Sequence, residues 1–291
     1  MKLKRIISIA LSLLIASLLL ASCGEKTDDS KEQLKLISTA ADITEILGGL
    51  GLNDAVVAAD TYSSDVSGIS AEICTLDYMN PNIEAILGLS PDVVFVSGSS
   101  TDGTVDPYSA LKDSGVNVIY VPTALSIDGI KENIALIADA VDKKDESDKL
   151  IKEIDDAVAN AKAKADGLEK VSVYFEIGAA PWLYSFGSGT FLNDIITICG
   201  GENIYAEQSG WLSNTEESVL TANPSVIITN VMYDGYDSAE ILSRPGWDTI
   251  DAVKNSRVVS VDANASSRGS QNIVKAIEEI SKAIHPEAYG N

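Results

Sequence analysis

Short apolar runs alternate with amphipathic segments along most of the chain, a pattern typical of buried strands separated by helices. β-branched runs bounded by polar turns predict strands at residues 36–38, 55–57, 93–96, 116–120, 171–175, 226–229 and 258–261. Apolar residues at helical spacing predict helices at residues 41–50, 83–89, 108–113, 127–141, 191–199, 216–222, 239–242 and 272–284. Largely apolar strands separated by helices indicate an α/β protein with two lobes, each a parallel sheet covered on both faces.

A charged, Ala-rich stretch at residues 145–168 lies between the two halves and carries apolar residues at helical spacing. At about 1.5 Å per residue, one helix over this stretch would span about 36 Å, enough to reach from one lobe to the other. We expect an N-terminal lobe at residues 34–143, an interlobe helix at 144–169 and a C-terminal lobe at 170–291. Such a stiff connection favours small rocking motions of the lobes over wide hinge bending.

One short motif occurs once in each half. In both copies a residue typical of a helix N-cap precedes a Glu by two positions, while a Leu and a Pro follow before a β-branched run. The copies are Asn82-Ile83-Glu84 with Leu87 and Pro91, and Thr215-Glu216-Glu217 with Leu220 and Pro224. Carboxylates at matching places on separate lobes suit a two-fold symmetric partner. The alternative is that Glu84 and Glu217 only stabilise the N-terminal ends of their own helices.

The first residues indicate export. A basic start at residues 1–5 precedes an apolar run at 6–20, which is short for a membrane span. The sequence Leu20-Ala21-Ser22-Cys23 then resembles a bacterial lipobox, so we expect a signal peptide at residues 1–22 and a lipidated Cys23. Residues 23–33 are polar and predict a flexible tether with a reach on the order of 18 Å. The folded part would lie outside the cytoplasm, anchored to the cell membrane by lipid.

The charge balance narrows the choice of partners. The chain has 43 Asp and Glu against 21 Lys and Arg, a net charge of −22, and the expected signal peptide holds three of the basic residues and no acidic one. A surface this acidic repels nucleic acid and anionic lipid head groups, and it suits docking to a basic protein surface.

Residues with reactive side chains are few. Cys74 and Cys199 are the only thiols besides Cys23, and because they fall in opposite halves we expect two separate, buried thiols without a disulfide. His285 is the only His, which argues against a bare divalent-metal receptor and against an extracellular hydrolase with a Ser-His triad. The chain contains no Gly-x-Ser-x-Gly elbow and no Walker A motif, so we expect no enzyme, no metal site and no cofactor, and ATP hydrolysis would belong to a partner.

An ordered set of motifs covers nearly the whole chain after the tether. The set comprises Thr44-Glu45-Ile46-Leu47, residues 82–92, Val173-Tyr174-Phe175-Glu176, Gly189-Thr190-Phe191-Leu192, Gly200-Gly201-Glu202-Asn203-Ile204, Arg244-Pro245-Gly246-Trp247 and His285-Pro286. In this order the motifs resemble the ABC-transporter substrate-binding proteins for iron complexes and cobalamin. The resemblance implies two Rossmann-like lobes joined by a helix, a ligand cleft between them, and delivery to an ABC permease dimer with cytoplasmic ATPase subunits. It also implies that Glu84 and Glu217 pair with arginines on the two permease subunits.

Aromatic residues suggest what fills the cleft. Tyr78 lies six residues before Glu84 and Trp211 six before Glu217, and these positions resemble aromatics that face the corrinoid in cobalamin-binding members. Tyr62 resembles another such aromatic, and we expect Trp182 near the cleft as well. Flat ligands are held by apolar contact and ring stacking, although each aromatic taken alone could equally belong to the core or the rim.

Arginines are scarce, which bears on ligand charge. Only Arg244, Arg257 and Arg268 remain after the signal peptide, whereas an anionic ferric siderophore would be expected to need several convergent arginines. Arg268 could reach the cleft, or its serine-rich segment could only cap the last helix. The sequence therefore favours a corrinoid of the cobalamin type, with a ferric siderophore, heme or another chelate as alternatives.

Overall fold

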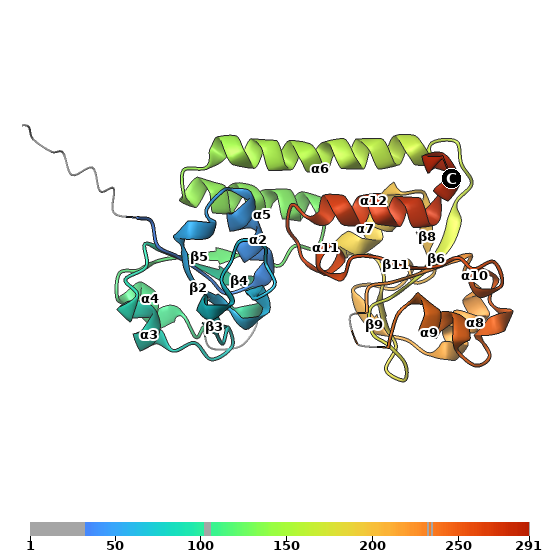
Figure 1. Cartoon of the computed structure of the whole chain (residues 1–291), viewed down its shortest axis with the longest axis horizontal. Helices are drawn as coiled ribbons and strands as arrows, with labels where there is room; N and C mark the ends of the chain where they lie inside the picture. The colour runs from blue at the N-terminus through green and yellow to red at the C-terminus, as the bar shows by residue number, and fades with distance from the viewer. Residues whose placement is uncertain (1–32, 102–105, 232, 234, 291) are drawn as a thin grey trace, which may run out of the picture. The chain divides into compact units, whose positions relative to one another are not determined.

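The computed structural model describes residues 33–101, 106–231, 233 and 235–290. Cys23 and most of the expected tether lie outside the described residues. Lys35–Asn291 form one compact unit. Within this unit the strands make two parallel sheets in two lobes, which confirms the predicted α/β fold (Figure 1). Among the described residues, none of the helices has both the length and the apolar character that crossing a membrane requires.

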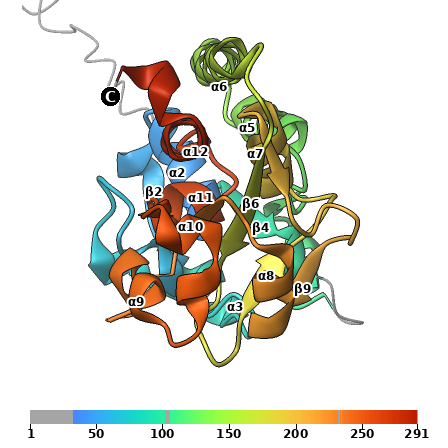
Figure 2. The same ribbon diagram turned by 90° about the vertical axis from the view of Figure 1, so that its right-hand side faces the viewer.

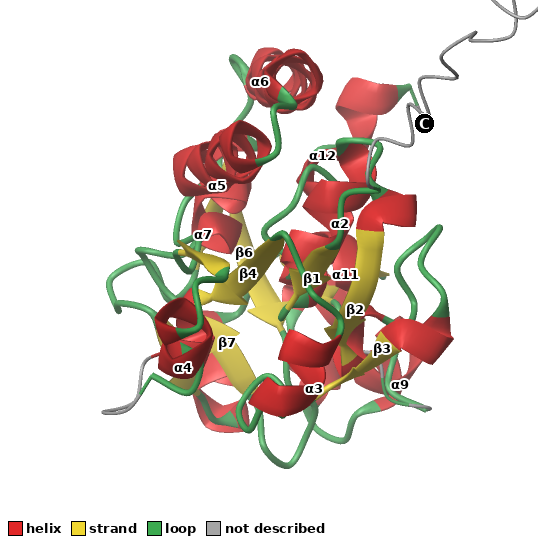
Figure 3. Cartoon of the chain, turned by 90° about the vertical axis from the view of Figure 1, so that its left-hand side faces the viewer, coloured by secondary structure: helices red, strands yellow, loops and turns green. Residues whose placement is uncertain are grey.

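The first lobe is built on a five-stranded parallel sheet with the order β3-β2-β1-β4-β5. Its strands are β1 (Leu36–Ser38), β2 (Val56–Asp60), β3 (Cys74–Leu76), β4 (Val93–Ser97) and β5 (Asn117–Val121), and its helices are α2 (Ala41–Gly49), α3 (Ile83–Gly88), α4 (Ser109–Asp113) and α5 (Ile127–Ala140). Figure 3 shows α2 and α5 on one side of these strands and α3 and α4 on the other.

Side-chain alternation along the strands explains this layering, because successive residues of a strand point to opposite faces. Ile37, Val94 and Val96 share a buried cluster with Ile86 of α3 and Leu111 of α4. On the other face, α2 contacts β1 and β2 while α5 contacts β5. Both faces are therefore covered, as the continuous apolar runs of the strands predict.

The second lobe repeats the plan with a four-stranded parallel sheet in the order β11-β10-β6-β8. Its strands are β6 (Val171–Glu176), β8 (Gly201–Asn203), β10 (Val226–Thr229) and β11 (Val258–Ser260), and its helices are α7 (Phe191–Ile198), α8 (Glu216–Ala222), α9 (Ser238–Ser243), α10 (Asp251–Lys254), α11 (Ala263–Ser267) and α12 (Ile273–Ile284). Ile227 of the sheet packs in one cluster with Val219 of α8, Ile241 of α9 and the buried ring of Trp247.

The pattern of apolar residues did not predict several short strands. β7 (Tyr184–Phe186) and β9 (Trp211–Ser213) pair antiparallel in a small ribbon beside the second sheet. β3 and β8 are three-residue strands at the sheet edges, and β8 consists of Gly, Glu and Asn, residues of low β-propensity. Tertiary pairing overrides local preference at these places.

The long helix α6 (Lys144–Ala165) covers the stretch where the sequence predicts an interlobe helix. It packs on α5 of the first lobe and on α7 and α12 of the second, and Figure 1 shows it running past both lobes. Leu150, Ile154 and Ala161 form its buried stripe, spaced as an amphipathic helix requires. One helix thus contacts both lobes, and restriction of the lobes to small rocking motions stays a prediction.

Candidate functional site

Two adjoining pockets share Trp211 and Ser267, and together they form the interlobe cleft. Residues of both lobes line the first pocket, and residues of the second lobe line the second. The first, of about 280 Å³, is lined by Ala40, Ala41, Asp42, Ser97, Ser99, Thr123, Ala124, Leu125, Phe191, Trp211, Ser267, Arg268 and Gly269. The second, of about 320 Å³, is lined by Ile177, Leu192, Trp211, Asn230, Val231, Tyr233, Ser266 and Ser267.

The cleft lies at the carboxyl ends of strands from both sheets. Ser97 ends β4, and Ala40 follows β1, its neighbour in the first sheet. Ile177 follows β6 and Asn230 follows β10, its neighbour in the second sheet. In each sheet the order of strands reverses between these two neighbours. Open α/β sheets bind ligands at such a switch point, so both lobes present their expected binding edge to the cleft.

Local hydrogen bonds hold the first-lobe wall in place. The Ser97 amide donates to Thr39 Oγ1 over 2.8 Å, and the hydroxyls of Ser97 and Ser99 lie 2.9 Å apart. A Cβ on Gly98 would lie 2.9 Å from the Thr123 amide nitrogen. Glycine at this position therefore lets the segments after β4 and β5 approach closely enough to form one polar wall.

Of the four aromatic residues expected at the ligand, the structure brings Trp211 into the cleft. It lines both pockets, remains 44% exposed, and packs edge to face on Phe186 with ring centroids 5.9 Å apart. Tyr62 and Tyr78 form an edge-to-face pair at 6.3 Å on the first lobe, and they line neither pocket. Trp182 is 84% exposed and also lines neither pocket. Ligand contact by these three stays a prediction.

Several residues of the cleft were not predicted from the sequence, among them Asp42, Phe191 and Tyr233. Phe191 and Asp42 each lie in the first turn of a helix, where they read as ordinary helix-start residues. Tyr233 follows β10 closely and is 68% exposed. Only their position in the sequence could have indicated them, because each follows the end of a strand or a loop that leads into a helix. Such placement becomes informative once the strand order is known.

Asp42 is an acid in the first pocket without a cationic partner among the described residues. Its Oδ1 accepts a hydrogen bond from the Ile43 amide at 2.9 Å, and a Cβ on Gly269 of the second lobe would lie 4.0 Å from its Oδ2. Burial raises the pKa of Asp42 to about 6, with smaller contributions from the charges of Glu45 and Asp60. A carboxyl group with so perturbed a pKa in a cleft is typical of a functional position.

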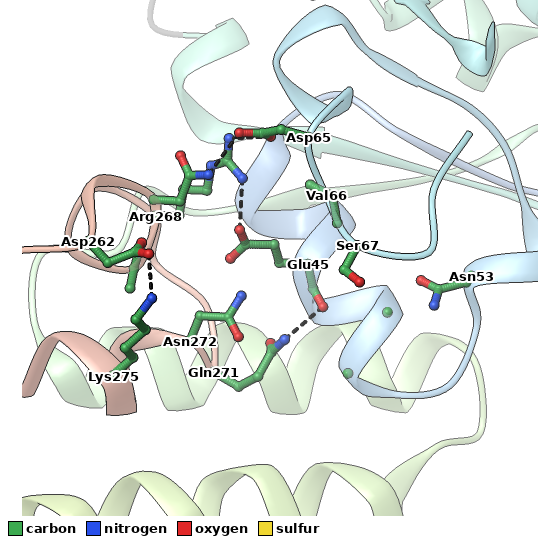
Figure 4. Close-up of a pocket in the computed structure, with 14 residues that line it drawn as sticks. Glu45, Asn53, Asp65, Val66, Ser67, Asp262, Arg268, Gln271, Asn272 and Lys275 are labelled. Carbon is green, nitrogen blue, oxygen red and sulfur yellow. Dashed lines mark hydrogen bonds and ion pairs between the residues drawn. The ribbon is translucent and has the colours of Figure 1, made fainter. Parts of the chain in front are cut away.

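Arg268 lines the first pocket, and its contacts with the first lobe also join the lobes. Its guanidinium pairs with Glu45 at 2.8 Å and with Asp65 at 2.7 Å, and it donates to the Tyr62 carbonyl over 3.2 Å. Two carboxylates of the first lobe thus neutralise the guanidinium group that the sequence analysis considered for ligand binding. Arg268 also lines a third, lateral pocket of about 500 Å³, whose walls include Glu45, Asp65 and Lys275 (Figure 4).

Further bonds tie the start of α12 to α2. Ser270 Oγ donates to the second carboxylate oxygen of Glu45, and Gln271 Nε2 donates to the Glu45 carbonyl over 2.8 Å. Ser270 Oγ also accepts from the Asn272 amide at 3.2 Å, in the turn before α12, and no described side chain caps the start of this helix. The Glu45–Arg268–Asp65 group, called here the interlobe clamp, is therefore part of a wider polar contact between lobes.

The repeated motif folds in the same way in both lobes. Asn82 Oδ1 accepts from the Ala85 amide at 3.0 Å, and Thr215 Oγ1 accepts from the Ser218 amide at 3.2 Å. The N-cap residues thus satisfy the helix ends, and Glu84 and Glu217 are exposed at the second position of α3 and α8. Neither carboxylate bonds to another described residue.

The likeness of the two copies extends into the turns that follow. Ser90 and Asn223 adopt left-handed backbone conformations, with φ of 51° and 45°, each directly before the Pro of its copy. Figures 1 and 2 show α3 and α8 on the side of the lobes away from α6. One exposed carboxylate per lobe is therefore carried on the same side by equivalent short helices.

The remaining candidate residues have structural roles. His285 is buried, its Nδ1 lies 3.1 Å from Glu287 Oε1, and its ring faces Gly200. Cys74 and Cys199 are free and buried, which confirms the prediction of two separate thiols. No group of metal-ligating side chains occurs among the residues that the structure describes.

Comparison with known proteins agrees with this architecture. The model of the periplasmic binding protein family matches residues 36–265. The ABC transporter substrate-binding lipoprotein YvrC of Bacillus subtilis, itself uncharacterized, is 29% identical over 96% of this chain and 96% of its own length. A vitamin B12-binding protein of Vibrio parahaemolyticus is 25% identical over 84% of this chain and 87% of its own.

A solved structure adds to the evidence for the fold. The periplasmic heme-binding protein HutB of Vibrio cholerae superposes with a TM-score of 0.76 at 20% identity, covering 87% of this chain and 100% of that one. At this identity the likeness shows the fold alone. The family match, by contrast, spans most of the chain, so this protein is a member of the periplasmic binding protein family, as its ordered motifs predict.

Proposed function

We propose that this protein is an extracytoplasmic lipoprotein that holds a cobalamin-type corrinoid in the interlobe cleft and delivers it to an ABC importer. The observation that carries the proposal is the cleft itself, in which the carboxyl ends of both parallel sheets meet around Trp211. An exposed indole between two lobes suits a broad, flat ligand, because ring stacking and apolar contact need a large surface. The vitamin B12-binding relative supports the same ligand class.

Heme is the second candidate. Its support is the exposed phenol of Tyr233 in the second pocket, since a Tyr oxygen can ligate heme iron. A ferric siderophore has less support, because Arg268 is already paired with Glu45 and Asp65.

Fluorescence titration of the mature protein distinguishes these ligands. Trp211 should be quenched by cyanocobalamin, whereas hemin and a ferric siderophore should bind more weakly. Trp211→Ala should weaken corrinoid binding about tenfold or more through lost stacking and buried area. Trp182→Ala tests whether this indole, in the same lobe but outside both pockets, also contacts the ligand; an unchanged dissociation constant would exclude it. Saturable binding of hemin without binding of cyanocobalamin would show that the ligand is heme and not a corrinoid.

The bound molecule should leave the protein chemically unchanged. The relatives are transport components, and the chain offers no pair of nucleophile and base in the cleft among its described residues. Mass spectrometry of the ligand before and after incubation tests this point, and turnover would indicate an enzyme.

We further propose that Glu84 and Glu217 dock the protein to the two permease subunits. The support is that both carboxylates are exposed and unpaired on equivalent helices, whose ends are capped by Asn82 and Thr215. Capping therefore does not require them. Exposed charges of this kind contribute orientation and association rate more than affinity.

Charge reversal separates docking from ligand binding. The double variant Glu84→Lys and Glu217→Lys should abolish ligand uptake by cells while leaving ligand affinity in solution unchanged. Glu132→Lys with Glu202→Lys, two exposed acids on α5 and β8, makes the matched control with the same change in net charge. Normal uptake by the double reversal at α3 and α8 would refute docking through these residues.

Membrane anchoring rests on Cys23, which lies outside the described residues. The lipoprotein YvrC, similar over nearly the whole chain, supports the same processing here. Cys23→Ala should leave the protein without lipid label and release it from the membrane fraction; retained labelling would contradict the assignment.

A further inference from the structure

We infer that Asp42 makes the interlobe cleft selective for ligands whose periphery carries uncharged hydrogen-bond donors, such as carboxamides, and unfavourable for ligands that present carboxylates. The inference rests on the proposed function, because it assumes that the ligand occupies this cleft. It concerns one residue of the first lobe that neither the repeated motif nor the aromatic positions involve.

The charges that line the cleft point to this selectivity. Among the described residues of the first pocket, only Asp42 and Arg268 carry a charge, and the described walls of the second pocket carry none. Arg268 is held by Glu45 at 2.8 Å and by Asp65 at 2.7 Å. Its positive charge is thus more than balanced within the protein. A ligand entering the cleft meets a negative wall with no free cation among these residues to bind an anion.

The contacts of Asp42 show where its negative charge lies in the cleft. One carboxylate oxygen accepts from the Ile43 amide at 2.9 Å, while the other approaches Gly269 on the opposite lobe. The carboxylate therefore lies where residues of both lobes line the first pocket. An ionised carboxylate only accepts hydrogen bonds, so it favours N–H donors and repels a second carboxylate.

The neighbouring groups do not cancel the effect. Ser97, Ser99 and Thr123 complete the same wall, and their hydroxyls can donate or accept. Glu45 on the same helix and Asp60 at the end of β2 add further negative charge near Asp42, and Arg268 is the one cation of the described pocket walls. Asp42 consequently decides which ligand charge the first pocket accepts.

Matched pairs of ligands test the inference by calorimetric titration at about pH 8, above the pKa of about 6 for Asp42. Cyanocobinamide carries peripheral amides, and cobyrinic acid carries carboxylic acids on the same kind of ring. The wild-type protein should bind the amide ligand more tightly. In Asp42→Asn the dissociation constant of cobyrinic acid divided by that of cyanocobinamide should fall about tenfold or more. The variant loses both the hydrogen bonds from the amides to a charged acceptor and the repulsion between Asp42 and the ligand carboxylates. Asp139→Asn, an exposed acid on α5, is the control and should leave the ratio unchanged.

A second pair separates this inference from the proposed ligand. If neither corrinoid binds, the corrinoid proposal falls, and hemin against hemin diamide then poses the same question for a porphyrin. The inference would be overturned if, for the ligand pair that binds, Asp42→Asn leaves the ratio of the two dissociation constants unchanged. Absence of binding in both pairs would overturn it together with the proposed function.

Discussion

The buried ion pair of the second lobe gives the sharpest test of what holds this fold together. Arg244 donates to both oxygens of Glu176, over 2.9 Å and 3.1 Å, and the two side chains are only 4% and 1% exposed. Glu240 binds the same guanidinium, whose centre lies 4.2 Å from the ring of Trp247. Arg244→Met would keep much of the apolar contact with Trp247 but leave Glu176 buried beside a second acid, without its cation.

Removing one partner of a buried pair costs about 3 to 5 kcal/mol, because the remaining charge has lost both water and its counterion. For a protein of this size that loss lowers Tm by roughly 10 °C. Trp182, Trp211 and Trp247 are the only tryptophans, and all lie in the second lobe. Intrinsic fluorescence during urea unfolding therefore reports on the lobe that contains the change. Lys170→Met, which removes an exposed cation, should change stability by less than about 0.5 kcal/mol.

The pH dependence gives a second readout with a definite sign. Burial already raises the pKa of Glu176 despite the contacts with Arg244, and loss of the guanidinium would raise it further. A carboxyl group with a raised pKa in the folded state destabilises that state fully above the folded pKa, and the cost disappears as pH falls towards the unfolded value. Arg244→Met should thus lose less stability at about pH 5 than at about pH 8.

A compensating change completes the test. Adding Glu176→Gln to Arg244→Met removes the uncompensated buried charge and should restore more than about 1 kcal/mol. A loss below about 1 kcal/mol for Arg244→Met, or a loss that neither acid pH nor Glu176→Gln relieves, would refute the reasoning.

Three further predictions concern other parts of the molecule. Arg268→Met should cost about 2 kcal/mol, less than the Arg244 change because Asp65 is half exposed, and should speed hydrogen exchange in α2; unchanged exchange would show that the interlobe clamp does not restrain the lobes. Asp42→Asn should raise Tm at about pH 8 by removing a buried charge that costs up to about 3 kcal/mol, and should have no effect at about pH 3; equal effects at both pH values would contradict the pKa of about 6. Cys199, fully buried and with its pKa raised by burial to about 12, should react with a thiol reagent only after unfolding, and rapid labelling of the native protein would disprove its burial.

Local patterns in the sequence determine much of this protein. The β-branched runs become the central strands β1, β4, β6 and β10, because a strand buried on both faces is apolar at most positions. The stripe of apolar residues in the charged stretch places α6. The repeated motif predicts two equivalent short helices, since N-caps, left-handed turns and prolines act on the backbone within a few residues.

The interlobe cleft depends on contacts that no local pattern encodes. Arg268 meets Glu45, 223 residues away in the chain, so its role as part of the interlobe clamp follows only from how the lobes pack. Asp42 resembles any acid in a first helical turn until its carboxylate is seen to approach Gly269 on the other lobe. The edge strand β8 forms from residues with little preference for a strand, because pairing with β6 satisfies its backbone. The net charge of the cleft depends on which carboxylates pair with a cation. This pairing forms only when the two lobes pack together.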